Sequence, residues 1–260
     1  MDDYNRREFI RTSLPGFLGL TLALPGITAM ATRANGKEGR LDQSKKINWD
    51  AFLEGVAKES ARQHLDDWNE LAYVKKVQAI ASQLRLDDPV LLEAFKKAEV
   101  GIGDGSIDFD RLEKQKDFQI SYLQFEKGEK IRHHDHPGMT GVLLCATGEL
   151  VTENYTLLDE ELDESKELKE LGGQGAEGEE IAVKRVLLKG AGRTVLKKGG
   201  TANLTSKQRN IHRVEARELS QIIDVFAPPY NRERGAATKW FTVDEERYRG
   251  RKGVYEAVLG

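Results

Sequence analysis

RHHDHPGMTG, residues 132–141, contains three of the five histidines of the chain and one acid among them. The side chains of a β-strand alternate between its two faces, so His134 and His136 point the same way while His133 and Asp135 point the other way. Two imidazoles on one face are either part of a metal site or a polar patch, since solvated and core histidines are common. The residues that flank the pair favour the metal site.

Glycines flank this histidine pair at a regular spacing. Gly128 lies six positions before His134, and Gly141 and Gly148 follow His136. The spacing resembles the first motif of the cupin superfamily, G-x5-H-x-H-x4-E-x6-G, except that Gly141 replaces the glutamate. Glycines permit the tight turns that join the strands of a small barrel. The missing glutamate removes an anionic ligand, so the resemblance implies an all-histidine site.

A third ligand has to come from a later strand, and His212 in QRNIHRVEA remains to supply it. The second cupin motif is otherwise degenerate, because LTSKQRNIH lacks the usual P-x-G ahead of its histidine. Asn210, two residues earlier, either orients this last ligand or serves as a turn residue.

Three separated motifs, HDHPGMT, NIH and IIDVFAPPY, occur here in the order that they have in one family of cupins. They resemble the thiol dioxygenases of the cysteamine dioxygenase and plant cysteine oxidase family. The resemblance covers roughly residues 115–245 and includes TKWFTV, which is similar to the aromatic strand that ends the family's barrel. The chain departs from the family in an acidic insertion at 159–180, in its first helices and in an export signal.

This resemblance implies a reaction and a set of site residues. His134, His136 and His212 would bind Fe(II), with Asp224 and Tyr230 as catalytic residues beside the metal. Asp224 lies in an apolar stretch where a carboxylate is costly to bury without a partner, whereas Tyr230 follows two prolines and could simply cap the barrel. Both atoms of O2 would be added to the sulfur of a small aminothiol, cysteamine or cysteine, or of a peptide with an N-terminal cysteine, giving a sulfinate.

Two other functions remain open at this point. The protein could be another metal-dependent cupin enzyme, a ring-opening dioxygenase or an isomerase, which would use the same histidine site on a substrate other than a thiol. A non-catalytic cupin that binds a ligand in the cell envelope would use the helices and the acidic insertion as contact surfaces.

Short β-branched or aromatic runs, separated by glycine and charge, predict a mainly β protein. We expect a cupin barrel, a double-stranded β-helix or jelly roll, at residues 106–260. Apolar residues at helical spacing from Trp49 onwards predict a helical segment at 48–105 that packs on the barrel. The acidic insertion 159–180 contains DESKELKEL, which suggests a helical turn, and is expected to be a solvated surface insertion or a partner-binding loop.

The N-terminus resembles a twin-arginine export signal. NRREFIR, residues 5–11, matches the pattern R-R-x-F-[IL]-[KR], and Ala29-Met30-Ala31 supplies the small residues that a signal peptidase needs. We therefore expect a signal peptide at 1–31, a flexible linker at 32–47, transport by the twin-arginine export machinery and a periplasmic location. The apolar run is broken by proline and glycine and is too short to span a bilayer, so no membrane span is expected after cleavage.

The composition indicates one moderate globular domain and excludes some partners. The chain has 260 residues with 39% hydrophobic content, 40 basic and 43 acidic side chains and a formal net charge of -3. Without an excess of positive charge to neutralise phosphates, nucleic acid is not an expected partner. Cys145 is the single cysteine, so an internal disulfide is excluded, and its apolar surroundings in GVLLCATG predict a buried packing thiol.

Overall fold

The computed structural model describes residues 45–99, 107–162, 165–169, 179–230 and 237–260. The predicted signal peptide 1–31 and most of the predicted linker 32–47 lie outside these residues. Ile47, the last residue of that linker, is held by the backbone on both sides: its N–H donates to the carbonyl of Gln83 and its carbonyl accepts from the N–H of Arg85, both at 2.9 Å. No helix in the described ranges is long and apolar enough to cross a membrane.

In the described part of the chain, helices precede the sheets, as the spacing of the apolar residues predicted. They are α2 (Trp49–Ser60), the short 3-10 helix η1 (Ala61–His64), α3 (Glu70–Gln83) and α4 (Pro89–Glu99). The side chains of Asn48 and Asn69 cap α2 and α3 by accepting hydrogen bonds from backbone N–H groups in their first turns.

A buried carboxylate joins two of these helices. Asp88 accepts hydrogen bonds from the backbone N–H of Val90 in the first turn of α4, at 3.0 Å, and from that of Trp49 in the first turn of α2, at 3.1 Å. Both donors lack a partner within their own helices, so one side chain satisfies two helix ends. Asp88 therefore links α2 to α4 without the help of the sheets.

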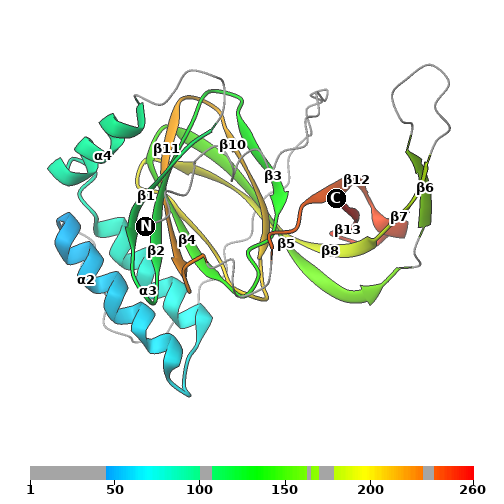
Figure 1. Ribbon diagram of the computed structural model, residues 1–260, viewed down its shortest axis with the longest axis horizontal. Coiled ribbons are helices and arrows are strands. Elements are labelled where there is room, and N and C mark those ends of the chain that lie inside the picture. Colours follow the sequence, from blue (N-terminus) through cyan, green and yellow to red (C-terminus); the bar gives the residue numbers. More distant parts are fainter. Residues whose placement is uncertain (1–44, 100–106, 163–164, 170–178, 231–236) are drawn as a thin grey trace. The chain divides into compact units, whose positions relative to one another are not determined.

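The strands form two main antiparallel sheets (Figure 1). The first has the order β1–β2–β11–β4–β9 and consists of β1 (Asp108–Lys114), β2 (Gln119–Phe125), β11 (Ser220–Ala227), β4 (Thr140–Thr147) and β9 (Thr201–Leu204). The second has the order β12–β13–β8–β5–β10–β3 and consists of β12 (Phe241–Arg247), β13 (Val254–Leu259), β8 (Arg185–Lys197), β5 (Glu149–Glu161), β10 (Ile211–Ala216) and β3 (Lys130–His134). A 3-10 turn, η3 (Tyr248–Gly250), lies between β12 and β13.

Consecutive strands alternate between the two sheets. The chain passes from β2 to β3, β4 and β5, and again from β8 to β9, β10 and β11, changing sheet at every step. Apolar side chains of both sheets meet in one buried cluster, made of Leu123, Phe125, Leu143, Cys145, Leu150, Leu196, Val214, Ala216 and Ile222. This alternation around a shared core confirms the predicted jelly-roll barrel.

The central strands of the first sheet, β2, β11 and β4, are buried on both faces. The outer face of this sheet contacts α3 and α4, while α2 packs on α3 (Figure 1), and the side chains of strands and helices form one continuous core there. Phe95 of α4 stacks on Tyr122 of β2 with ring centroids 4.8 Å apart, and every residue of β2 is buried. The helices thus pack on the outer face of the first sheet, whose inner face lines the barrel interior.

The insertion at 159–180 differs from the helical turn expected there. β6 (Ser165–Lys169) pairs antiparallel with β7 (Glu179–Val183). The two strands follow β5 and precede β8 in the chain and form a small sheet of their own. The helical turn predicted for DESKELKEL is therefore wrong over Ser165–Lys169. Helix propensity is worth only a fraction of a kcal/mol per residue, so the backbone hydrogen bonds of a neighbouring strand readily override it.

Candidate metal centre

The three predicted histidines come together between β3 and β10. His134 ends β3 and lies directly opposite His212 of β10 in the antiparallel register, while His136 follows two residues after His134. One nitrogen of each ring lies within 4.8 Å of the others, and the Nε2 atoms of His136 and His212 are 2.9 Å apart. All three side chains are buried. The pairing of two strands has thus brought together histidines that are 76 residues apart in sequence.

Burial keeps these imidazoles neutral. It lowers the pKa of His134 to about 4. Burial first, and the neighbouring histidines second, lower the pKa of His136 and of His212 well below the usual value. A neutral imidazole has one nitrogen with a free lone pair, which is the form that binds metals.

Hydrogen bonds select the nitrogen that faces the cluster. The Nδ1–H of His134 donates to the carbonyl of Arg132 at 2.7 Å, which leaves its Nε2 unprotonated. In the tautomer of His136 that keeps Nε2 free, Nδ1–H donates to the hydroxyl oxygen of Tyr230 at 2.5 Å. Burial, followed by the charges of Asp224 and Asp135, raises the pKa of Tyr230 well above its usual value, so the hydroxyl stays neutral. Tyr230 therefore contacts the side of His136 that is turned away from the other two rings.

Asn210 holds the backbone of His136 in place. Its Oδ1 accepts a hydrogen bond from the N–H of His136 at 2.8 Å, and its Nδ2 donates to the carbonyl of the same residue at 3.0 Å. Nδ2 also donates to the carbonyls of Thr205, at 2.9 Å, and Met139, at 3.4 Å. The sequence suggested that Asn210 orients the last ligand or serves in a turn. The structure places its amide against the second ligand, His136, and its bond to Thr205 also holds the loop before β10.

The glycine that replaces the motif's glutamate has a structural reason. A Cβ atom added at Gly141 would lie 2.4 Å from Cε1 of Phe226, far closer than two carbons can approach. The ring of Phe226 stacks on the imidazole of His136 with centroids 4.5 Å apart. An aromatic ring therefore takes the space that a carboxylate ligand would need, and this side of the cluster is apolar.

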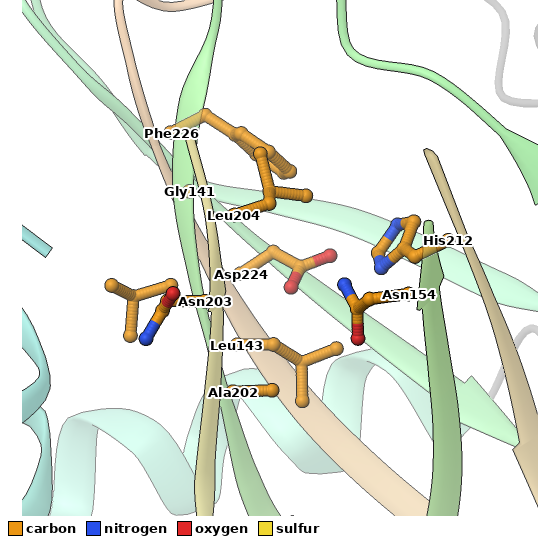
Figure 2. A pocket seen from close by; sticks show the side chains of 10 residues that line it. Gly141, Leu143, Asn154, Ala202, Asn203, Leu204, His212, Asp224 and Phe226 are labelled. Carbon is orange, nitrogen blue, oxygen red and sulfur yellow. The ribbon is translucent and has the colours of Figure 1, made fainter. Parts of the chain in front are cut away.

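Asp224 lines a pocket beside the histidines (Figure 2). Its side chain, on β11, points from the first sheet towards His212 of the second, with Leu143 and Leu204 on either side of it (Figure 2). In the described part of the chain it makes no hydrogen bond or ion pair, and burial raises the pKa of its carboxyl to about 7. A carboxylate that is partly exposed to the pocket and lacks a protein partner is free to bind a cationic group.

His133 and Asp135 lie outside the cluster, as strand alternation predicts. The ring of His133 packs edge-on against Tyr155 at 5.3 Å, and burial lowers its pKa to about 3. Asp135 accepts a hydrogen bond from the N–H of Lys239 at 2.6 Å and returns one from its own N–H to the Lys239 carbonyl at 3.0 Å. Asp135 therefore fixes the chain that leads into Trp240.

The sequence assigned no role to four residues at the site. The indole of Trp240 lies 5.2 Å from the ring of His134, and the guanidinium of Arg132 lies 5.5 Å from the indole centroid. Phe226 and Asn154 also line the pocket. Trp240 belongs to the aromatic stretch TKWFTV. Only the structure, in which an isolated β-bridge pairs Trp240 with His134, shows that its indole contacts the ring of His134.

The donor set fits a metal ion. Bonds of about 2.1 Å to each nitrogen place the nitrogens of a compact site roughly 3 Å apart, close to the separation between His136 and His212. Neutral imidazoles suit iron, zinc, copper and nickel, and among the described residues no carboxylate belongs to the group. The barrel is that of a cupin, and its three-histidine cluster fits a metal site.

The family follows from a direct comparison. The family model PCO_ADO matches residues 74–256, and the chain belongs to this family of cysteamine and plant cysteine oxidases. It is accordingly a thiol dioxygenase, an oxidoreductase. The match begins within α3, so it includes α4 and part of the helical segment that had looked dissimilar.

Several solved structures are distantly similar. KdgF from Halomonas sp. is 14% identical, with 51% of this chain and 87% of that chain covered and a TM-score of 0.32. A cupin superfamily protein from Desulfitobacterium hafniense is 15% identical, with 48% and 81% covered and a TM-score of 0.29. A conserved protein with a double-stranded β-helix domain from Klebsiella pneumoniae is 18% identical, with 54% and 82% covered and a TM-score of 0.32. No curated protein matches the chain significantly.

Replacing Asn210 by alanine is expected to weaken metal binding by roughly 10- to 100-fold, because the backbone of His136 loses the amide that fixes it. Competition with a chelator measures the affinity, and circular dichroism checks the fold. Asn203→Ala is the matched control, because its amide bonds Gln78 on the helical side. Unchanged metal affinity in a folded Asn210→Ala protein would show that His136 is held by other contacts.

Proposed function

We propose that this thiol dioxygenase uses iron(II), held by His134, His136 and His212, to oxidise a small aminothiol or a peptide with an N-terminal cysteine. The observation that carries the proposal is the convergence of three neutral imidazoles in a chain of the PCO_ADO family. Iron(II), when bound, would supply the place where the thiolate sulfur and O2 react. The reaction R–SH + O2 → R–SO2⁻ + H⁺ balances without a further cosubstrate, because sulfur loses the electrons that O2 gains.

The ligand set favours a thiolate substrate. His134, His136 and His212 contribute no negative charge, and Phe226 occupies the space of a carboxylate ligand. A free thiol has a pKa of about 8.5 and is mostly protonated at neutral pH. A cationic centre with neutral ligands stabilises the thiolate, which is the reactive form of the substrate.

Two further residues have assigned roles in this proposal. Asp224 holds the ammonium group of the aminothiol, since its carboxylate lies in the pocket without a protein partner. Tyr230 acts through His136, because its hydroxyl contacts Nδ1 and so favours the tautomer with Nε2 towards the cluster.

Oxygen consumption tests the proposed function. Protein loaded anaerobically with iron(II) is expected to consume O2 with cysteamine, cysteine or a peptide with an N-terminal cysteine, and the product should gain two oxygen atoms on sulfur by mass spectrometry. His212→Ala should abolish this activity, whereas His64→Ala, at an exposed histidine paired with Asp117, should retain it. Fully iron-loaded protein that consumes O2 with dihydroxyaromatics but not with thiols would indicate another metal-dependent cupin, and no uptake with either would indicate a binding protein.

The pH dependence tests the role of Asp224. Burial raises its pKa to about 7, so the carboxylate that binds an ammonium group forms as the pH rises through about 7. We expect kcat/KM for cysteamine, divided by that for 2-mercaptoethanol, to rise over this range, because the ratio cancels titrations that both thiols share. Asp224→Asn should remove this rise and increase the KM for cysteamine only. A ratio that is independent of pH in the unmodified protein would contradict the assignment.

We also propose that the protein is exported by the twin-arginine machinery, on the strength of the motif at residues 5–11. Replacing both Arg6 and Arg7 by lysine keeps the charge but loses the guanidinium groups, and the export address is read by a receptor. The lysine variant is expected to remain in the cytoplasm, as measured by cell fractionation and immunoblotting. Equal periplasmic amounts of both proteins would refute export by this route.

A further inference from the structure

Glu70 at the start of α3 holds the turn that precedes β10. Its Oε2 accepts a hydrogen bond from the backbone N–H of Ser206 at 3.0 Å, although the two residues are 136 positions apart in the sequence. Further along α3, Gln78 donates to the hydroxyl of Thr201 on β9 at 3.1 Å, so the helix lies along the strand that leads into the turn. Glu70 therefore ties the helical segment to residues 205–210, which we call the ligand turn.

The ligand turn has its own hydrogen bonds but contains an unfavourable backbone conformation. The N–H of Thr205 donates to the carbonyl of Gln208 at 2.9 Å, and the N–H of Gln208 donates to Oγ1 of Thr205 at 3.0 Å. Arg209 has a φ of 60°, in the left-handed region that a residue with a side chain seldom adopts. Such a conformation persists only where the surrounding structure imposes it, so the turn depends on contacts from outside.

Two different parts of the fold supply these outside contacts. On β5, Oγ1 of Thr156 accepts from the N–H of Arg209 at 3.0 Å, and Nδ2 of Asn154 donates to its carbonyl at 3.1 Å. The other end of the turn is held by the bond from Ser206 to Glu70. The second sheet thus fixes the end of the turn next to β10, and α3 fixes the end next to β9.

The end that α3 fixes is connected to a metal ligand. The carbonyl of Thr205 accepts from Nδ2 of Asn210 at 2.9 Å, and the same carboxamide pairs with the N–H and the carbonyl of His136 at 2.8 and 3.0 Å. Thr205, Asn210 and His136 are all buried, so a displaced carboxamide would leave polar groups without partners and without water. A movement of Thr205 is therefore passed on to His136.

We infer that Glu70 is a positioning residue of the metal centre, acting on His136 through the ligand turn and the carboxamide of Asn210. Glu70 lies outside residues 74–256, which the family model matches. The inference rests on the three-histidine centre of the proposed function but not on the thiol substrate. Ligand distances in a well-formed metal site stay within about 0.2 Å of their usual values, so a small displacement of His136 is enough to weaken metal binding.

Glu70 also has a role that involves no metal. It is the first residue of α3, where a negative charge interacts favourably with the helix dipole. Loss of that charge alone would lower the stability of the helix. Glutamine at this position separates the two roles, because its carboxamide oxygen still accepts a hydrogen bond from Ser206 whereas its charge is lost.

The test measures the affinity for cobalt(II), by competition with a chelator, and the visible spectrum of the cobalt(II)-loaded protein, which reports how the ligands are arranged. Glu70→Ala is expected to weaken binding by about threefold to tenfold and to alter the spectrum, because one charge-assisted hydrogen bond is lost. Glu70→Gln should restore most of the affinity and the original spectrum. Glu93→Ala is the matched control, because Glu93 pairs with Lys97 within α4 at 2.9 Å, and it should behave as the unmodified protein.

A double variant identifies the route from Glu70 to the metal. In a protein that already carries Asn210→Ala, the change Glu70→Ala should cause no further loss of affinity, because the link to His136 is broken, whereas independent effects would multiply. Circular dichroism establishes that each variant is folded.

Three results would overturn the inference. They are an unchanged affinity and spectrum in folded Glu70→Ala, equal losses in Glu70→Ala and Glu70→Gln, and multiplied losses in the double variant. Unmodified protein that binds no cobalt(II) or iron(II) would refute the metal centre itself, and the proposed function with it.

Discussion

The antiparallel pairing of β3 with β10 is the constraint on which the site depends. It sets His134 opposite His212, and the short segment after β3 brings His136 to the same point. Because side chains alternate along a strand, a shift of this register by one residue would turn His212 to the other face of the sheet and remove it from the cluster. The same row extends to Asn154, so one set of backbone hydrogen bonds aligns both the metal ligands and a wall of the pocket.

A second network connects this pairing to the helices. Glu70 of α3 accepts a hydrogen bond from the N–H of Ser206 at 3.0 Å. The turn that begins there leads to Asn210, whose side-chain amide makes two hydrogen bonds to the backbone of His136. Asn210 also donates to the carbonyl of Thr205, which closes the turn on itself. The helical segment therefore does more than cover the first sheet, since it also braces the loop that fixes one metal ligand.

The chemistry of the site follows from what surrounds the imidazoles. Phe226 fills the space left by Gly141 and excludes an anionic ligand from that side, while burial keeps the three rings neutral. Asp224 is the carboxylate in the lining of the pocket. Its pKa is raised because burial removes the carboxyl from water and no basic group of the described residues pairs with it. Under the proposed function, neutral ligands beside the carboxylate of Asp224 would favour a substrate with a thiolate sulfur and a positive amine.

The residues alone predicted a mainly β protein and the shared face of His134 and His136, because these follow from short apolar runs and from the two-residue alternation of strand side chains. The resemblance of three motifs to a cupin family added the jelly-roll class, His212 and the role of Asp224. Neither determined which groups meet across the barrel. The contact of Asn210 with His136, the ring of Phe226 in the place of a glutamate, and the approach of Asn154 to Asp224 join strands and loops far apart in the chain. The β6–β7 hairpin likewise replaced a local helical preference. The local sequence determines on which face of a strand or helix a side chain lies. The residue that this side chain contacts depends on strand pairing and packing, which only the tertiary structure decides.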